Sequence, residues 1–294
     1  MINSINDKRK LVAKGMSVVS AFLVSLLCLT GCTREMETRY DSGKLQEKFE
    51  VRKESDGNYI KHGNYTSWYE SGQKKQEGKY IGGKESGIHT FWHENGQKKS
   101  EGGFKDGRKD GKHVFWYDSG QIESEGEYID DKKTGHWISW YVNGQKKSEG
   151  EYKDNKRVGI WFSWFENGQK ESETSFKDNL KHGYSVKWFS NGQKQYEGEY
   201  NEGRRIGMWV CWYENGQKNF EGEFKDEREN GKWVYWHKNG QKESEWEYKD
   251  GKWDGRYISW HDNGQKKSEG EYKDGKKIGK WLYWDENGKI KLGS

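Results

Sequence analysis

The sequence contains no proline, so any strand in it can keep all of its backbone N–H donors in a hydrogen-bonded ladder. Hydrophobic residues make up only 30% of the 294 residues and charged residues 34%, a balance that favours disorder. Aromatic residues, which are scarce in disordered chains, nevertheless reach 16% and recur at fixed intervals. We therefore expect the chain to fold.

The chain also lacks an excess of one charge beyond its first 31 residues. That segment holds four basic side chains and one acidic side chain, which account for most of the formal net charge of +4. In the remainder the two signs are nearly balanced and interleaved. A nucleic-acid-binding protein carries a basic stripe instead, so we expect no nucleic-acid partner.

Long hydrophobic runs are missing as well. The longest, Met16 to Thr30, follows a basic segment and has the length of a signal-peptide core, too short for a membrane span. The next residues, Leu29-Thr30-Gly31-Cys32, resemble the lipobox of bacterial lipoproteins. This resemblance implies that residues 1–31 are a signal peptide, that Cys32 is lipidated, and that residues 32–39 are a tether.

The predicted location is therefore the cell membrane or the outer membrane, with the lipid-anchored protein facing the periplasm or the cell exterior. Thr33 in place of aspartate favours the outer membrane by the same resemblance. If Cys28 is removed with the signal peptide and Cys32 is modified, Cys211 is the only thiol that is left. An internal disulfide is then excluded.

Residues 40–294 are organised by a repeat of 24 residues, about ten copies in all. Repeat positions are counted here from a turn glycine that recurs without drift at Gly72, Gly96, Gly120, Gly144, Gly168, Gly192, Gly216, Gly240, Gly264 and Gly288. Position 20 is always tryptophan, position 18 is mostly apolar, and position 8 is always tyrosine or phenylalanine. Polar residues alternate with them, which is the period of a β-strand.

Two turn geometries compete at the Asn-Gly segment. A two-residue loop places Trp260 on the face of Lys267, whereas a three-residue loop pairs Trp260 with Lys266. We favour the three-residue loop, because we expect it to gather the tryptophans of position 20, the small residue of position 6 and the aromatic residue of position 8 on one face. A second turn, often Asp-Gly, joins each hairpin to the next strand. Thr174 and Trp246 depart from the glycine that is usual at position 6.

The segment 269–281, Glu-Gly-Glu-Tyr-Lys-Asp-Gly-Lys-Lys-Ile-Gly-Lys-Trp, resembles a MORN repeat, in the bacterial variant with an Asn-Gly-Gln turn. The resemblance covers residues 63–291. It implies an all-β fold, an elongated single-layer array of stacked antiparallel β-hairpins, and a role in binding or scaffolding. Some bacterial proteins of this kind carry an antitoxin label.

We expect no enzyme, no catalytic residues, no cofactor and no metal. Glutamates at position 5 recur beside lysines at positions 2 and 3, and a feature of every copy is better explained as a structural charge ladder than as acid–base chemistry. His237 and His261 share a position in adjacent copies, about 10 Å apart, which is too far for one zinc ion. Cys211 is expected to be an inert strand residue.

Tryptophans and tyrosines at position 17 offer a second aromatic stripe. A single sheet buries one face more easily than two, and exposed aromatic patches mark interaction sites, although twist and curling of the sheet could also hide the stripe. The residues of this stripe, together with an aromatic-rich stretch near the C-terminus, are the candidate binding residues: Trp137, Trp161, Trp209, Trp233, Trp246, Trp253, Tyr257 and Trp281.

The sequence thus predicts a lipid-anchored, non-enzymatic module that binds a protein or an envelope polymer through an aromatic, mixed-charge sheet surface. One alternative is a carbohydrate-binding or cell-wall-binding module, because sugars stack on such rings. The other is an antitoxin-like inhibitor of a toxin, which fits poorly with an exported product.

Overall fold

The computed structural model describes residues 33–291, and within that range it contains strands and turns but no helix. None of these residues, therefore, belongs to a helix with the length and hydropathy of a membrane span. The predicted signal peptide and the predicted lipidation of Cys32 lie outside the described residues. The chain divides into two compact units, residues 1–108 and 109–294.

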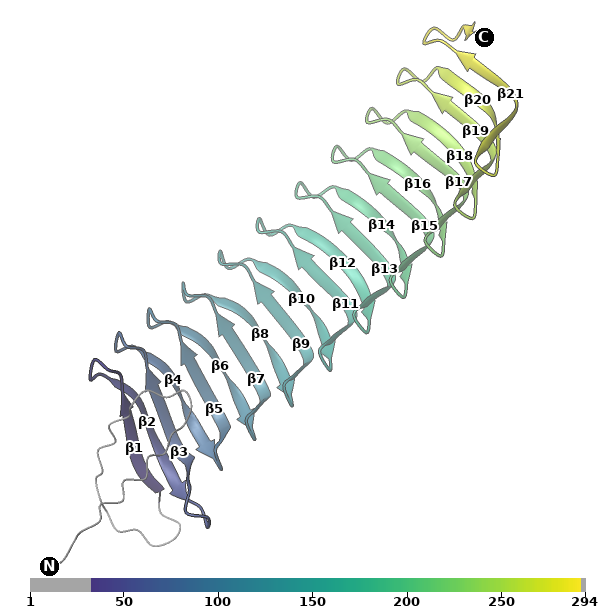
Figure 1. The fold of residues 1–294 in the computed structure, drawn as a ribbon. Coiled ribbons are helices and arrows are strands. Elements are labelled where there is room, and N and C mark those ends of the chain that lie inside the picture. Colours follow the sequence, from purple (N-terminus) through teal and green to yellow (C-terminus); the bar gives the residue numbers. More distant parts are fainter. Residues whose placement is uncertain (1–32, 292–294) are drawn as a thin grey trace, which may run out of the picture. The chain divides into compact units, whose positions relative to one another are not determined.

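The first unit is an antiparallel meander in which each strand pairs with the next along the chain (Figure 1). Its strands are β1 (Thr33–Arg39), β2 (Leu45–Lys53), β3 (Tyr59–Trp68), β4 (Lys74–Ile81), β5 (Lys84–Trp92) and β6 (Lys98–Lys105). The prediction of a tether is wrong for residues 33–39, because they form β1 and pair with residues 45–52 of β2. In this unit Gly43 and Gly72 are 29 residues apart instead of 24, and the turn between β2 and β3 is correspondingly long, at residues 54–58.

The second unit repeats the same meander in a single antiparallel layer, and its first strand begins at Arg108, one residue before the unit boundary. Its strands are β7 (Arg108–Trp116), β8 (Ile122–Ile129), β9 (Lys132–Trp140), β10 (Lys146–Lys153), β11 (Lys156–Trp164), β12 (Lys170–Lys177), β13 (Leu180–Trp188), β14 (Lys194–Asn201), β15 (Arg204–Trp212), β16 (Lys218–Lys225), β17 (Arg228–Trp236), β18 (Lys242–Lys249), β19 (Lys252–Trp260), β20 (Lys266–Lys273), β21 (Lys276–Trp284) and β22 (Ile290–Lys291). The all-β fold of antiparallel hairpins is confirmed.

The Asn-Gly turns have the predicted three-residue loop. The backbone N–H of His261 donates to the carbonyl of Gln265 at 2.8 Å, and the N–H of Gly264 donates to the carbonyl of His261 at 2.9 Å. Gly264 has a φ of 80°, in the left-handed region that glycine adopts without a steric penalty. Trp260 pairs with Lys266, as expected.

The expected sorting of side chains, however, is wrong. The ladder shifts by one residue directly after the turn, so that Ser259 pairs with Ser268 and Lys267 is left as a bulge. Because strand side chains alternate between faces, this extra residue moves position 20 to the opposite face from positions 6 and 8. The tryptophan that shares a face with those positions is the one at position 17.

The second turns hold adjacent copies together. Asp154 and Asn155 both have a positive φ, 50° and 66°, as a two-residue hairpin turn requires. The N–H of Asn155 donates to the carbonyl of Lys133 at 3.0 Å, and the N–H of Lys133 donates back to the side-chain oxygen of Asn155 at 2.8 Å. This reciprocal pair offsets the strain of a left-handed asparagine and ties one copy to its predecessor.

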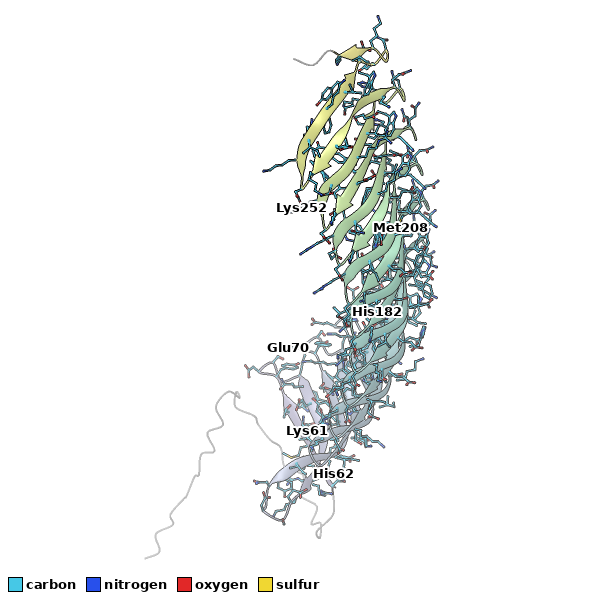
Figure 2. All side chains as sticks on the ribbon, turned by 90° about the vertical axis from the view of Figure 1, so that its right-hand side faces the viewer. Lys61, His62, Glu70, His182, Met208 and Lys252 are labelled. Atoms are coloured by element: carbon cyan, nitrogen blue, oxygen red, sulfur yellow. The ribbon has the colours of Figure 1, made fainter. Side chains whose placement is uncertain are left out.

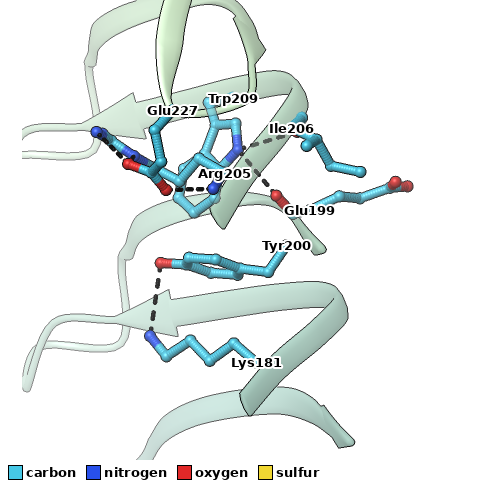
Figure 3. A network of polar contacts seen from close by, with 7 residues as sticks. All are labelled: Lys181, Glu199, Tyr200, Arg205, Ile206, Trp209 and Glu227. Atoms are coloured by element: carbon cyan, nitrogen blue, oxygen red, sulfur yellow. Dashed lines mark hydrogen bonds and ion pairs between the residues drawn. The ribbon is translucent and has the colours of Figure 1, made fainter. Parts of the chain in front are cut away.

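The face that carries positions 6, 8 and 17, named here the aromatic face, contains the core. Tyr200 packs edge-on against Trp209 with ring centroids 5.0 Å apart, and Trp209 packs in turn on Phe224 at 6.2 Å. The indole N–H of Trp209 donates to the carbonyl of Glu199 at 3.2 Å (Figure 3). The guanidinium of Arg205 covers the ring of Phe224 at 3.9 Å and forms an ion pair with Glu227 at 3.1 Å. Aromatic rings therefore pack from strand to strand on this face around position 17, and not around position 20 as expected.

The opposite face, named here the charged face, carries the predicted charge ladder. Lys266 contacts Glu269 at 2.7 Å, and the same pair recurs in seven other copies. The bulge after each turn is what places these two positions on one face. The hydrogen bond from Lys266 lowers the pKa of Glu269. Lys266 also lies over the position-20 ring of Trp284 at 5.2 Å, so these tryptophans are covered by cations.

His113 takes the place of tryptophan at position 17, and this substitution predicts acid sensitivity. The side chain of His113 is 2% exposed, and its pKa is lowered, mainly because burial disfavours the charged imidazolium. The positive charge of Lys109 lowers this pKa further, whereas the hydrogen bond to the carbonyl of Gly111 and the negative charge of Asp131 oppose the shift. The unfolded chain therefore binds a proton at a higher pH than the folded chain. Stability is expected to fall as the pH drops below about 6.5, the ordinary value for histidine.

The measurement is urea unfolding of the full chain and of His113→Trp between pH 7.5 and pH 5. The stability of the original chain relative to the variant should decrease with acid. A difference that stays constant over this range would contradict the assignment.

Candidate functional site

Four of the candidate binding residues lie inside the core. Trp137, Trp161, Trp209 and Trp233 are between 2% and 6% exposed. Each is covered by aromatic rings from the neighbouring strands and, at Trp137 and Trp161, by Lys133 and Arg157, respectively. The prediction that this stripe offers an exposed binding surface is therefore wrong for these four residues.

The other four candidates are half-buried and pack against one another and against Tyr272. The ring of Trp246 lies 4.4 Å from that of Trp253 and 4.3 Å from that of Tyr257. Tyr257 in turn lies 5.6 Å from Trp281. These contacts bring the predicted C-terminal aromatic cluster together, but as packing within the sheet.

Packing on the aromatic face follows a pairing rule between positions 6 and 17. The indole of Trp161 lies directly on the backbone of Gly150, where an added Cβ would be 2.4 Å from the ring. The same glycine and tryptophan pair occurs at 126 and 137, 198 and 209, 222 and 233, and 270 and 281. Position 6 is glycine because the ring occupies the space of a side chain.

Two copies break the rule in both partners at once. In one, Trp246 pairs with Tyr257 and the position stays aromatic. In the other, position 6 is Thr174 and position 17 is Ser185, and their hydroxyls form a buried hydrogen bond of 2.8 Å. Without an indole at residue 185, the aromatic packing is interrupted. One core cluster ends at Phe176 and the next begins at Tyr196. A hollow of about 370 Å³ lies between them, lined by Thr174 and Phe176 among others.

A second break lies beside the first, in the row formed by positions 4 and 19 across consecutive strands of the aromatic face. In several copies this row consists of paired serines, such as Ser139 with Ser148 and Ser163 with Ser172, whose hydroxyls are 2.7 Å apart. From β13 to β16 the paired residues of the row change instead to the larger Lys187, Tyr196, Cys211 and Phe220.

These larger residues border a second hollow of about 870 Å³. The two hollows share Lys187 and Tyr196, so we treat them as one groove that follows the row across β10 to β16. The residues that line the groove come from β10 to β16 and from neighbouring turns: Tyr141, Lys147, Ser148, Arg157, Trp161, Phe162, Ser163, Glu171, Ser172, Thr174, Phe176, Lys181, Lys187, Phe189, Gln195, Tyr196, Cys211, Trp212, Tyr213, Glu214, Asn215, Asn219, Phe220 and Lys238.

Some polar side chains of the groove pair with other residues of the chain, and others do not. Among the lining side chains, five are cationic and two are carboxylates. Lys187 lies 3.8 Å from Glu171, with about a third of each side chain exposed, so the ion pair is weak. Gln195 and Asn219 occupy position 3, where most copies have lysine or glutamate. Within residues 33–291 their side-chain amides make no hydrogen bond.

Cys211 lines the groove, and burial raises the pKa of its thiol to about 11. At pH 8 the fraction of Cys211 in the reactive thiolate form is therefore about 100-fold smaller than that of an ordinary thiol, because the two pKa values differ by about two. We expect slow alkylation by iodoacetamide at pH 8 and a rate that keeps rising above pH 10. Peptide mass spectrometry measures the rate at this residue, with the urea-unfolded chain as the control. Equal rates in the folded and unfolded chains would contradict the expected burial.

The charged face offers a different surface in the same copies. Ile160, Tyr184 and Met208, all at position 16, are 50%, 49% and 58% exposed. Met208 is labelled on the right-hand side of the view in Figure 2. They form a row across β11, β13 and β15. Single exposed apolar residues are common, but three at one repeat position on every second strand offer a contact surface for a protein.

The histidines at position 21 of the last copies hold neighbouring copies together. The side-chain N–H of His237 donates to the carbonyl of Trp260 at 3.2 Å, and His261 does the same to Trp284. Tyrosines at this position make the equivalent bond in other copies, such as Tyr213 to Trp236 at 2.9 Å. In the described part of the chain, no three histidine, cysteine or acidic residues are grouped so as to hold a metal ion.

Comparison with known proteins agrees with this arrangement. The MORN repeat variant family matches residues 61–81, 85–106, 109–130, 133–154, 157–178, 205–226, 229–250, 253–274 and 277–292. No curated protein matches the chain. A solved structure, "Crystal Structure of TcdB2-TccC3", is 10% identical with a TM-score of 0.19; the match covers 87% of this chain but only 18% of that one, and is too weak to support an argument. The family match extends over most of the sequence, and the chain belongs to the MORN repeat variant family.

Proposed function

We propose that this chain is a non-enzymatic binding module, anchored by a lipid on Cys32, that binds a protein or an envelope polymer through the groove of its second unit. The anchor places it at the cell membrane or the outer membrane, facing the periplasm or the exterior. The lipobox-like segment before Cys32 supports the anchor. The groove supports the binding role.

One observation carries the proposal: the repeat is interrupted where the groove lies. Regular copies fill the aromatic face with an indole on a glycine, and their polar groups bond to each other. At Thr174 and Ser185 the indole is absent, and at Gln195 and Asn219 two side-chain amides make no hydrogen bond within residues 33–291. A feature that every copy shares holds the array together, whereas an open site with unused donors is suited to a ligand.

Cross-linking in intact cells tests the proposal. A photoreactive amino acid replaces Asn219 in the groove, Lys267 at the same repeat position in another copy, or Met208 on the charged face. We expect a covalent adduct from Asn219 and none from Lys267. Adducts from Met208 alone would move the binding surface to the charged face and contradict the proposal.

The lipid is tested separately. Cys32→Ala should release the chain from the membrane fraction, and retention of this variant would contradict the anchor. If the Asn219 adduct contains a single protein whose toxicity the chain suppresses, the antitoxin-like alternative gains support over an envelope polymer.

A further inference from the structure

We infer that the groove binds an acidic polysaccharide that runs across the strands. The inference rests on the proposed function, because it names the partner of the same groove. Three properties of the groove lead to it: the spacing of its amides and rings, their chemistry, and the balance of charge.

The first property is spacing. Gln195 and Tyr196 lie on β14, and the equivalent Asn219 and Phe220 lie on β16, with β15 between them. Two strand spacings separate the equivalent side chains, a distance of about 10 Å. This is close to the length of a disaccharide unit, so a polysaccharide that crosses the strands meets the same pair of groups once in every disaccharide. An extended peptide advances about 3.3 Å per residue and turns successive side chains to opposite sides, so it does not share this period.

The second property is the pairing of ring with amide. A pyranose has an apolar face of C–H groups and a rim of hydroxyls. The rings of Tyr196 and Phe220 can contact the C–H face, while the neighbouring amides of Gln195 and Asn219 both donate to and accept from hydroxyls. Since these amides make no hydrogen bond within the described residues, a sugar gains bonds without breaking any that the protein already makes.

The third property is charge. Lys187 lies where the two hollows meet, and Lys238 lies at the far end of the larger one. With Lys147, Arg157 and Lys181 they outnumber the two carboxylates of the lining. A sugar polymer with carboxylate groups complements this excess, whereas a neutral glycan gains only the stacking and the hydroxyl bonds.

Calorimetry with the full chain in detergent tests the inference. The probes are a hyaluronan hexasaccharide, the neutral hexamer of N-acetylglucosamine, hexa-aspartate and a single-stranded oligothymidylate. We expect the hyaluronan fragment to bind at least 10-fold more tightly than the neutral hexamer, and its affinity to fall as salt increases. Binding of hexa-aspartate or oligothymidylate as tight as that of hyaluronan would overturn the inference, because charge alone would then explain it.

Two variants locate the site. Gln195→Ala with Asn219→Ala should weaken hyaluronan binding at least 10-fold, while Lys267→Ala, which changes the same repeat position outside the groove, should leave it unchanged. Both chains should unfold at the same urea concentration as the original. An equal loss in both variants, or no loss in either, would overturn the assignment to the groove.

The outcome also separates this inference from the proposed function. If none of the sugars binds but Asn219 still cross-links to a partner in cells, the binding module stands and the polysaccharide is rejected. If neither experiment detects a ligand, both are rejected.

Discussion

Replacing Gly222 by alanine is expected to destabilise the second unit by about 3 kcal/mol, in the range measured for overpacked or truncated core residues. A Cβ at this residue would lie 2.1 Å from the indole of Trp233, which is 2% exposed. The indole then has to move, and it loses its bond to the carbonyl of Glu223, its stacking on Phe220 and its edge-to-face contact with Phe224.

The matched control is Thr174→Ala, at the same repeat position. This residue already carries a Cβ, so alanine costs only the hydrogen bond to Ser185, on the order of 1–2 kcal/mol. Urea unfolding followed by tryptophan fluorescence compares the variants. If Gly222→Ala unfolds at the same urea concentration as the original chain, the indole does not lie on the glycine as described.

The second large effect concerns the missing indole. Ser185→Trp alone is expected to destabilise the unit by about 3 kcal/mol, because Thr174 holds the place in which other copies have glycine. Thr174→Gly alone loses a hydrogen bond and gains backbone freedom in the unfolded chain, a cost of about 1–2 kcal/mol. The double variant restores the pair that regular copies use. We expect it to return to within about 1 kcal/mol of the original chain, a coupling of at least about 3 kcal/mol.

A double-mutant cycle measures this coupling. The control pair is Thr174→Gly with His261→Ala, two residues in copies that do not touch, for which the costs should add. Simple additivity of Thr174→Gly and Ser185→Trp would show that the two positions do not pack together. The double variant should also fill the smaller hollow, so it offers a folded chain in which this part of the groove is closed.

Most of the fold could be predicted from the sequence because it depends on local rules. The turn glycine needs a left-handed φ, and the interval between such glycines sets the length of the strands. The three-residue loop and the lysine–glutamate ladder are also local, and both are confirmed. The strand at residues 33–39 was missed because its sequence has no apolar alternation; Thr33 and its neighbours are recruited by pairing with β2.

The groove was harder to predict. Thr174 stood out in the sequence as a departure from glycine, but its meaning depends on Ser185, 11 residues later. Those two positions are neighbours only because of the register of the hairpin between them. The sequence also shows Tyr196 and Phe220 at position 4, where most copies have serine. The face on which positions 4 and 19 lie was not known from the sequence, so this change did not indicate a cavity.

The sequence by itself determined the period, the two kinds of turn and the all-β class, since each follows from the conformational preferences of a few residues in a row. The tertiary structure alone decided which aromatic row is buried. One bulged residue after each turn, such as Lys267, reverses the side on which every later side chain of the strand lies. A pattern of alternation looks the same for either outcome, so the choice between the tryptophans of positions 17 and 20 depends on which of them can lie on a glycine of the neighbouring strand.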